Sequence, residues 1–344
     1  MNTHRIFTSL SHGSLVALLL ASLAPLGCMA PTDGADEDPS AEDDAVTGKA
    51  SPLAGRKFFV DDENVATEKT KQAYAQHEYT RAHLLEKISN HAQGVWFGDW
   101  NKTIKHDVSA VVSRRGATVP ILVTYNIPGR DCGDYSDGGA ADTAAYHMWI
   151  NGFAAGIGNA EVVVILEPDA LWMTVGKKCA AVKNNLGTLK YAVHALKKQA
   201  HARVYIDAGM AGAPGDIANG LEQAGVSEAD GFALNTSDSY SNSSSASRGH
   251  DISDALGGKV HFVIDTSRNG TGRAKDQNIS NPWCNPKGLG LGKVSTGTTG
   301  LDRVDAFLWI KRPGQSDGEC GRNNPAAGQW FETRAEEMAK NAAF

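Results

Sequence analysis

Seven short apolar segments, each followed by a stretch of helical length, constrain the fold of this chain more than any other feature. Alternation of this kind specifies a parallel sheet covered by helices. Segments such as Val162–Leu166 are apolar without a two-residue period, so both faces of the sheet should be buried. We expect strands at Val95–Trp100, Val119–Ile127, Glu161–Glu167, Arg203–Asp207, Gly231–Asn235, His261–Thr266 and Ala306–Lys311, and helices near 66–91, 102–114, 141–157, 183–200, 215–224, 248–256 and 327–342. Seven such units in about 290 residues predict one barrel-like α/β domain.

The beginning of the chain has the composition of a targeting signal. An apolar run, Leu15–Leu26, follows Arg5 and is too short to span a bilayer, so residues 1–30 are expected to be a secretory signal peptide. Two cleavage sites fit. An ordinary signal peptidase would cut after Ala30, whereas a lipoprotein-type cut before Cys28 would leave a lipid on that cysteine and attach the protein to a membrane.

A second segment separates this signal from the folded part. Residues 31–51 are rich in Asp, Glu, Pro, Ser and Ala, which cannot bury apolar surface, so we expect a disordered acidic linker. Residues 52–344 should then form the folded domain. The protein is expected to be secreted or to be a lipoprotein of the cell envelope, and to be a monomer.

The charge balance argues against nucleic acid as a partner. The chain has 33 basic and 39 acidic residues, but residues 1–47 hold seven of the acids and one base, Arg5. The remainder therefore has 32 of each sign and no block of Lys and Arg. Binding to phosphates requires a basic surface that displaces counterions, and this composition lacks one.

Polar and charged residues gather where the expected strands end. In α/β barrels the active site is built at this carboxyl end of the strands. A single Asp at such a position is usually the N-cap of the next helix, but five strand ends with acids are more than capping needs. The residues are Tyr125, Arg130, Asp131, Glu167, Asp169, Asp207, Asn235, Asp265, Arg268, Lys311 and Asp317.

Four cysteines remain when Cys28 is set aside, an even number suited to an oxidising compartment. They allow three pairings. If neighbours along the chain pair, Cys132 with Cys179 and Cys284 with Cys320, each bridge fastens two loops at the carboxyl end of the sheet. No zinc-binding spacing is present, and the glycine-rich run 288–293 neither follows a strand nor has the spacing of a phosphate loop. We therefore expect neither a metal nor a cofactor.

Six short motifs resemble those of glycoside hydrolase family 6, the inverting cellulases. They occur in family order and cover nearly everything after residue 52. They are Tyr125–Cys132, Leu166–Asp169, Tyr205–Gly209, Asp265–Gly270, Trp283–Pro286, and Trp309–Lys311 followed by Ser316–Gly318. The resemblance implies a distorted seven-stranded β/α barrel with an open substrate cleft, which hydrolyses β-1,4-glucan, and it implies the same pairing of cysteines.

The resemblance also implies catalytic roles. Inverting hydrolysis needs a carboxylic acid that protonates the leaving oxygen and a route by which a water on the opposite face loses its proton. Asp169 matches the acid, whose pKa must be raised by burial or by a like charge. Asp131 matches the second essential Asp and would supply that charge and help to hold the water. Asp317 matches the candidate base, with proton loss through a chain of waters as the alternative, and Tyr125 would lie against the distorted sugar ring.

Sugar contacts come from aromatic platforms and polar side chains. The expected substrate-binding residues are Trp96, Arg130, Asp207, Asn235, Trp283, Lys311 and Gln315. The chain departs from the family where Met210 replaces a His, Ala213 a Trp and Gln315 a Glu. These departures bear on substrate preference and turnover.

The short segment between Cys320 and the last helix favours internal cleavage. Exo-acting members roof the cleft with long loops, whereas here only Gly321–Gly328 is available. The leading hypothesis is an inverting β-1,4-endoglucanase. The alternatives are a glucan-binding lipoprotein that has lost activity and a hydrolase of another β-glucan, such as mixed-linkage glucan.

Overall fold

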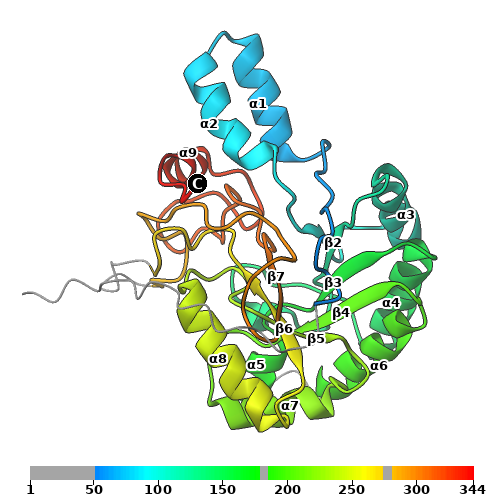
Figure 1. Ribbon diagram of the computed structural model, residues 1–344. Coiled ribbons are helices and arrows are strands. Elements are labelled where there is room, and N and C mark those ends of the chain that lie inside the picture. Colours follow the sequence, from blue (N-terminus) through cyan, green and yellow to red (C-terminus); the bar gives the residue numbers. More distant parts are fainter. Residues whose placement is uncertain (1–50, 179–184, 274–280) are drawn as a thin grey trace, which may run out of the picture. The chain divides into compact units, whose positions relative to one another are not determined.

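A sheet of seven parallel strands lies at the centre of the fold (Figure 1). The computed structural model describes residues 51–178, 185–273 and 281–344. Each strand pairs with its neighbours in sequence order, in parallel register throughout. The strands are β1 Val95–Phe97, β2 Ile121–Thr124, β3 Val162–Leu166, β4 Ala202–Asp207, β5 Gly231–Leu234, β6 His261–Asp265 and β7 Val304–Leu308. The predicted parallel, barrel-like α/β fold is confirmed.

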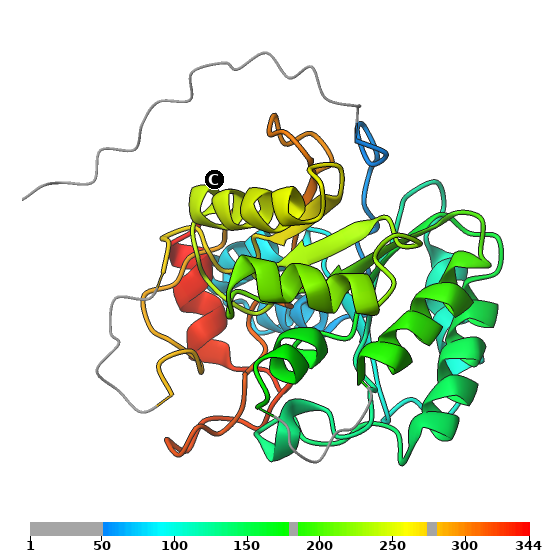
Figure 2. The same ribbon diagram turned by 90° about the horizontal axis from the view of Figure 1, so that it is seen from below.

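Helices cover the outer face of this sheet, as Figures 1 and 2 both show. All the described residues belong to one unit, Val46–Phe344. The helices are α1 Val65–Ala75, α2 Tyr79–Ser89, α3 Ile104–Arg114, α4 Thr143–Ile157, α5 Ala170–Val175, α6 Asn185–Lys197, α7 Pro214–Gln223, α8 Asn242–Ala255 and α9 Glu332–Lys340. Within the described ranges, no helix combines the length and the apolar composition that crossing a membrane requires.

Both faces of the strands are buried, as the apolar runs predict. In β3, Val162, Val164 and Leu166 face the helices and belong to the large outer core. Val163 and Ile165 point the other way, into a smaller core inside the curled sheet. Because successive side chains of a strand point to opposite faces, each strand contributes to both cores, and side chains fill the interior of the barrel.

The two edge strands meet without forming a ladder among the described residues. The Gly94 amide donates to the Trp309 carbonyl over 2.7 Å, and the Trp96 indole donates to the Ile310 carbonyl over 2.9 Å. A Cβ at position 94 would lie 2.3 Å from the Ile310 oxygen, so only glycine fits this approach. The seam between β1 and β7 thus rests on a few hydrogen bonds.

Three helix predictions differ from the structure, and one of them is the last helix, expected at 327–342 and observed at Glu332–Lys340. The expected helix at 66–91 is two helices, because the chain turns at His77, whose φ is 61°. The Glu78 amide donates to the Ala73 carbonyl and the His77 amide to the Tyr74 carbonyl, which is the hydrogen-bond pattern of a Schellman helix end. The helix predicted at 248–256 begins earlier, at Asn242, because Ser241 caps it by accepting from the Ser244 amide.

Candidate active site

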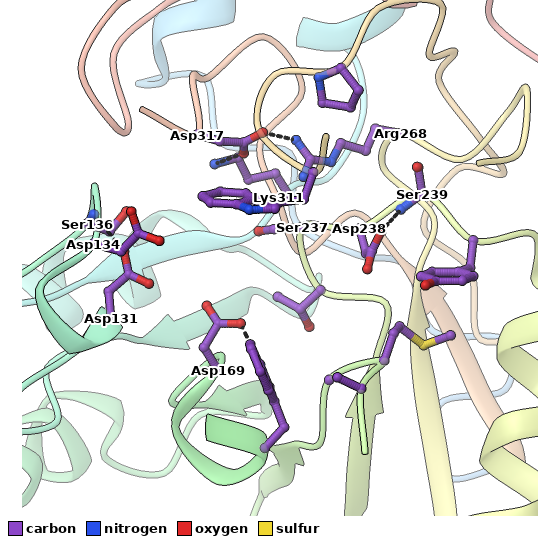
Figure 3. A pocket seen from close by; sticks show the side chains of 18 of the residues that line it. Asp131, Asp134, Ser136, Asp169, Ser237, Asp238, Ser239, Arg268, Lys311 and Asp317 are labelled. Carbon is purple, nitrogen blue, oxygen red and sulfur yellow. Dashed lines mark hydrogen bonds and ion pairs between the residues drawn. The ribbon is translucent and has the colours of Figure 1, made fainter. Parts of the chain in front are cut away.

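A cavity of about 420 Å³ lies at the carboxyl ends of the strands. Figure 3 shows Asp131, Asp134 and Ser136 on one side of it and Asp238, Ser239 and Arg268 on the other. Asp169 lies between these two groups, and Lys311 and Asp317 lie across the cavity from it. Three indoles and two phenols complete the wall, from Trp96, Trp172, Trp283, Tyr125 and Tyr240.

Asp169 follows β3 in a conformation unusual for an L-residue, with φ at 71°. It occupies the N-cap position of α5, but its side chain does not cap that helix. Instead Oδ1 accepts a hydrogen bond from the Trp172 indole over 2.9 Å. The Asp169 amide donates to Oδ1 of Asp207 over 3.1 Å. The carboxyl group is therefore held toward the cavity, and the ordinary capping role of a strand-end Asp does not apply.

Burial raises the pKa of Asp169 above its usual range. The Trp172 hydrogen bond and the Lys311 charge oppose this rise, and the charges of Asp238 and Asp317 add to it. Asp207, on the neighbouring strand, is almost fully buried, and its pKa is raised to about 8, first by burial and then by the charge of Asp169. Two adjacent buried carboxyl groups cannot both ionise easily near neutral pH.

Asp131 follows β2 and faces the same cavity. Its φ is 60°, and Oδ2 accepts from the Ser136 amide over 2.7 Å. Burial raises its pKa to about 7, against the hydrogen bond from Ser136 and with a further rise from Asp169. The charges of Asp131 and Asp169 therefore influence each other across the site.

Asp317 differs from these acids because two cations hold it. Arg268 Nη1 lies 2.7 Å from Oδ2 and Lys311 Nζ lies 3.1 Å from Oδ1, while the Asn285 amide donates to Oδ2 over 2.9 Å. Burial alone would raise the pKa of Asp317, but Arg268, Lys311 and the amide outweigh it and lower the pKa to about 2. This group stays ionised at any ordinary pH.

A disulfide joins Cys284 and Cys320, with Cα atoms 6.2 Å apart, as predicted. It ties the loop after β6 to the loop after β7, and these loops carry Trp283 and Asp317. The other predicted bridge joins Cys132 to Cys179, which lies outside the described residues, so that pairing stays a prediction.

Seven of the eleven predicted site residues line the cavity. They are Trp96, Tyr125, Asp131, Asp169, Trp283, Lys311 and Asp317. The other four, Arg130, Asp207, Asn235 and Gln315, do not line it.

These four residues act on the surrounding backbone and neighbours. Arg130 is buried, pairs with Asp99 and donates to the carbonyl of Tyr125. Asn235 donates to the Asp265 carbonyl and accepts from the Tyr240 amide. Asp207 accepts from Asp169, as described above. These hydrogen bonds hold the loops at the strand ends in place. Gln315 forms an isolated antiparallel β-bridge with Trp330.

Several residues that line the cavity were not predicted from the sequence. Asp238 and its serine neighbours follow β5, and the strand-end rule applied three residues beyond Asn235 would have included them. Asp238 faces Arg268, and burial raises its pKa. Trp172 carried no sequence signal, because its contact with Asp169 depends on a short helix, α5, that the sequence analysis did not predict.

Comparison with known proteins identifies the family of this chain. The profile of Glycosyl hydrolases family 6 matches residues 53–342, almost all of the described chain. The chain belongs to Glycosyl hydrolases family 6. Endoglucanase A of Cellulomonas fimi is 42% identical over 300 residues, which cover 85% of this chain and 62% of that protein. Endoglucanase A of Thermobispora bispora is 39% identical over 271 residues, which cover 76% of this chain and 57% of that protein.

Solved structures of the family have the same fold. The endoglucanase Cel6 of Mycobacterium tuberculosis, in complex with methyl-cellobiosyl-4-deoxy-4-thio-β-D-cellobioside, superposes with a TM-score of 0.77 at 36% identity, covering 85% of this chain and 99% of that one. Endoglucanase Cel6B of Humicola insolens gives 0.70 at 25% identity, covering 85% and 99%. This family 6 chain spans about three fifths of the length of the Cellulomonas and Thermobispora relatives.

Proposed function

We propose that this family 6 protein is an endo-β-1,4-glucanase, which hydrolyses internal glucosidic bonds of cellulose or a related β-glucan with inversion. The observation that carries the proposal is the position of the Asp169 carboxyl, which faces the cavity with a raised pKa and with the second carboxyl, Asp131, on one side. The endoglucanase names of the relatives support the same activity.

In this proposal Asp169 is the general acid. Its proton moves to the glycosidic oxygen as the bond from that oxygen to the anomeric carbon breaks. A water on the opposite face forms the new bond to that carbon, and its own proton passes on to the solvent through further waters. Asp131 and Ser136, which lie together on one side of the cavity, help to hold the attacking water.

We assign Asp317 an electrostatic part rather than direct proton acceptance. Its two oxygens are engaged with Arg268 and Lys311, and a carboxylate with a pKa of about 2 is a weak base. Its fixed negative charge stabilises the positive charge that develops on the sugar ring in the transition state.

Aromatic side chains provide the sugar platforms. Trp96 and Trp283 line the cavity, and the Trp96 ring is fixed because its nitrogen donates to the Ile310 carbonyl. Tyr125 packs edge-on against Trp96 with ring centroids 5.2 Å apart, in a position to contact a distorted ring. The eight residues Gly321–Gly328 are too few for a long covering loop, which supports internal cleavage.

The replacement Asp169→Asn tests the acid. We expect loss of turnover on carboxymethylcellulose and cello-oligosaccharides by roughly 10²–10⁴-fold with little change in glucan affinity. Retention of more than about a tenth of the wild-type rate would remove Asp169 from this role. Parallel assays on mixed-linkage glucan and xylan identify the preferred substrate, and binding without hydrolysis would favour the non-catalytic alternative.

Stereochemistry gives an independent test. Attack opposite to the leaving group must release the new reducing end first as the α-anomer. Proton NMR of the earliest products measures this directly. Early appearance of the β-anomer would contradict inversion.

We propose in addition that residues 1–30 direct export, that residues 31–51 link this signal to the domain, and that residues 52–344 are the catalytic domain. Where Cys28 carries a lipid, the protein is anchored to the cell envelope; otherwise it is secreted. Fractionation of cells that produce the full chain or its Cys28→Ala variant separates the two. Equal membrane partition of both proteins would exclude an anchor on this cysteine.

A further inference from the structure

Trp172 donates a hydrogen bond to Asp169 but has no part in the steps of hydrolysis proposed above. The indole Nε1 lies 2.9 Å from Oδ1 of the carboxyl group. No other described side chain or amide donates to this carboxyl group. Oδ2 is therefore left toward the cavity, where a glycosidic oxygen would lie.

The local fold fixes the indole in this place. Trp172 is three residues after Asp169, so the first turn of α5 brings the two side chains to the same side of the helix. The ring is half-buried, packs against the outer core and forms part of the cavity wall. Gly209 lies directly against it, and a Cβ at that position, where φ is 61°, would come within 2.4 Å of the Trp172 ring. The ring has little room to turn away.

An indole nitrogen can only donate, and this decides what it does to a carboxyl group. While it donates to Oδ1, that oxygen is disfavoured as the site of the proton, because an O–H there would compete for the same direction. The acidic proton is left to Oδ2. After the proton has been given away, the same N–H stabilises the carboxylate that remains.

We propose that Trp172 is the positioning residue of the general acid, which keeps the transferable proton of Asp169 on the oxygen that faces the substrate and stabilises the carboxylate produced by its transfer. This inference rests on the proposed function, because it presumes that Asp169 is the acid. Trp172 acts through Asp169 and has no proton of its own to give.

Other charges also face Asp169, and the test must separate them from the indole. They come from the ends of four strands and are Asp131 after β2, Asp207 at the end of β4, Asp238 after β5, and Lys311 and Asp317 after β7. A substitution of Trp172 that keeps a ring leaves all these charged groups in place. A rise in the pKa of Asp169 in such a variant is therefore due to loss of the indole N–H.

The experiment is the pH dependence of kcat/KM for Trp172→Phe. Phenylalanine keeps an aromatic ring and removes the donor, so the carboxylate is less stable and the acid holds its proton more tightly. The basic limb of the profile, which reports loss of the acid's proton, should move to higher pH by about one unit, the scale of one hydrogen bond to a charged group. A basic limb that stays where it is would overturn the inference.

The leaving group supplies a second readout that simple damage to packing would not reproduce. Cellohexaose has a poor leaving group that needs the proton, whereas 2,4-dinitrophenyl cellobioside has one that leaves without it. We expect Trp172→Phe to lower kcat at least tenfold on cellohexaose and less than threefold on the aryl substrate. Equal losses on both substrates would contradict a role in proton placement.

Two control variants make the interpretation specific. Trp149→Phe removes an indole N–H that is buried and has no partner among the described residues, so the basic limb should not move. Asp238→Asn removes a negative charge that raises the pKa of Asp169, so the limb should move to lower pH, opposite to Trp172→Phe. If Trp172→Phe does not fold, Trp172→Met also removes the donor and keeps a large apolar side chain against the outer core.

Failure of the inference can be told apart from failure of the proposed function. An inactive Asp169→Asn with an unshifted limb in Trp172→Phe overturns the positioning role and leaves the acid in place. An active Asp169→Asn overturns the assignment of the acid, whatever the tryptophan variants do.

Discussion

Replacing Asp317 by asparagine removes one charge and almost no volume from the most strongly paired acid of the site. The carboxylate is 7% exposed and contacts Arg268, which is 6% exposed, as well as Lys311. In Asp317→Asn the Arg268 guanidinium keeps its charge in a buried position and loses its partner. Breaking a buried pair from one side is destabilising because the remaining charge is uncompensated.

The expected loss of stability in Asp317→Asn has two contributions. A pKa of about 2 in the folded protein, against 3.8 for an unperturbed Asp, corresponds to roughly 2.4 kcal/mol of stability at neutral pH. Leaving Arg268 unpaired brings the cost of the substitution to about 3–5 kcal/mol. Because the folded pKa is depressed, the contribution is complete above the unfolded value near 4 and is lost as the pH falls toward 2. About half of the 2.4 kcal/mol should be gone at pH 3.

Equilibrium urea unfolding of the wild type and Asp317→Asn at pH 7 and pH 3 measures both numbers. The difference in the free energy of unfolding should shrink between the two pH values. A double-mutant cycle with Arg268→Met isolates the pair, since the second substitution removes the stranded charge and should recover part of the loss. A difference below about 1 kcal/mol at pH 7, or one that does not change with pH, would contradict the stabilising role of the Asp317 charge.

Three further outcomes are expected. Replacing Cys284 and Cys320 by serine should lower the free energy of unfolding by roughly 4 kcal/mol in urea titrations, since the bridge closes a loop with a separation of 36 residues. An unchanged urea midpoint would contradict a stabilising role of this disulfide. Gly209→Ala should reduce kcat on cellohexaose, because its Cβ would displace the Trp172 ring, and full activity would show that the ring can yield. Trp283→Ala should raise KM on cello-oligosaccharides about tenfold with a smaller effect on kcat, as loss of one stacking platform predicts, and an unaltered KM would remove this ring from the cleft.

The sequence predicted the order of the strands and the face on which the site lies. Both follow from local patterns, because apolar runs such as Val162–Leu166 identify buried parallel strands, and the residues just after parallel strands share one edge. Asp131, Asp169 and Lys311 could therefore be brought together from the sequence, although they lie far apart in the chain.

What could not be predicted is the direction in which a strand-end side chain turns. Arg130 and Asn235 occupy the same kind of position as Asp131, yet both turn toward backbone carbonyls that have lost their regular partners where the strand ends. Satisfying those groups is a tertiary requirement without a signature in the local sequence. Trp172 was missed for a related reason, since its contact exists only once a six-residue helix begins at Ala170.

The seam between β1 and β7 bears on when the cleft can first be complete as the chain folds. Trp96 comes from the first strand and Asp317 follows the last one, and both line the same cavity. More than 220 residues that follow Trp96 must therefore be in place before the cleft has all its walls. A folding chain can build its outer core strand by strand, but the proposed activity requires that β1 and β7 have met.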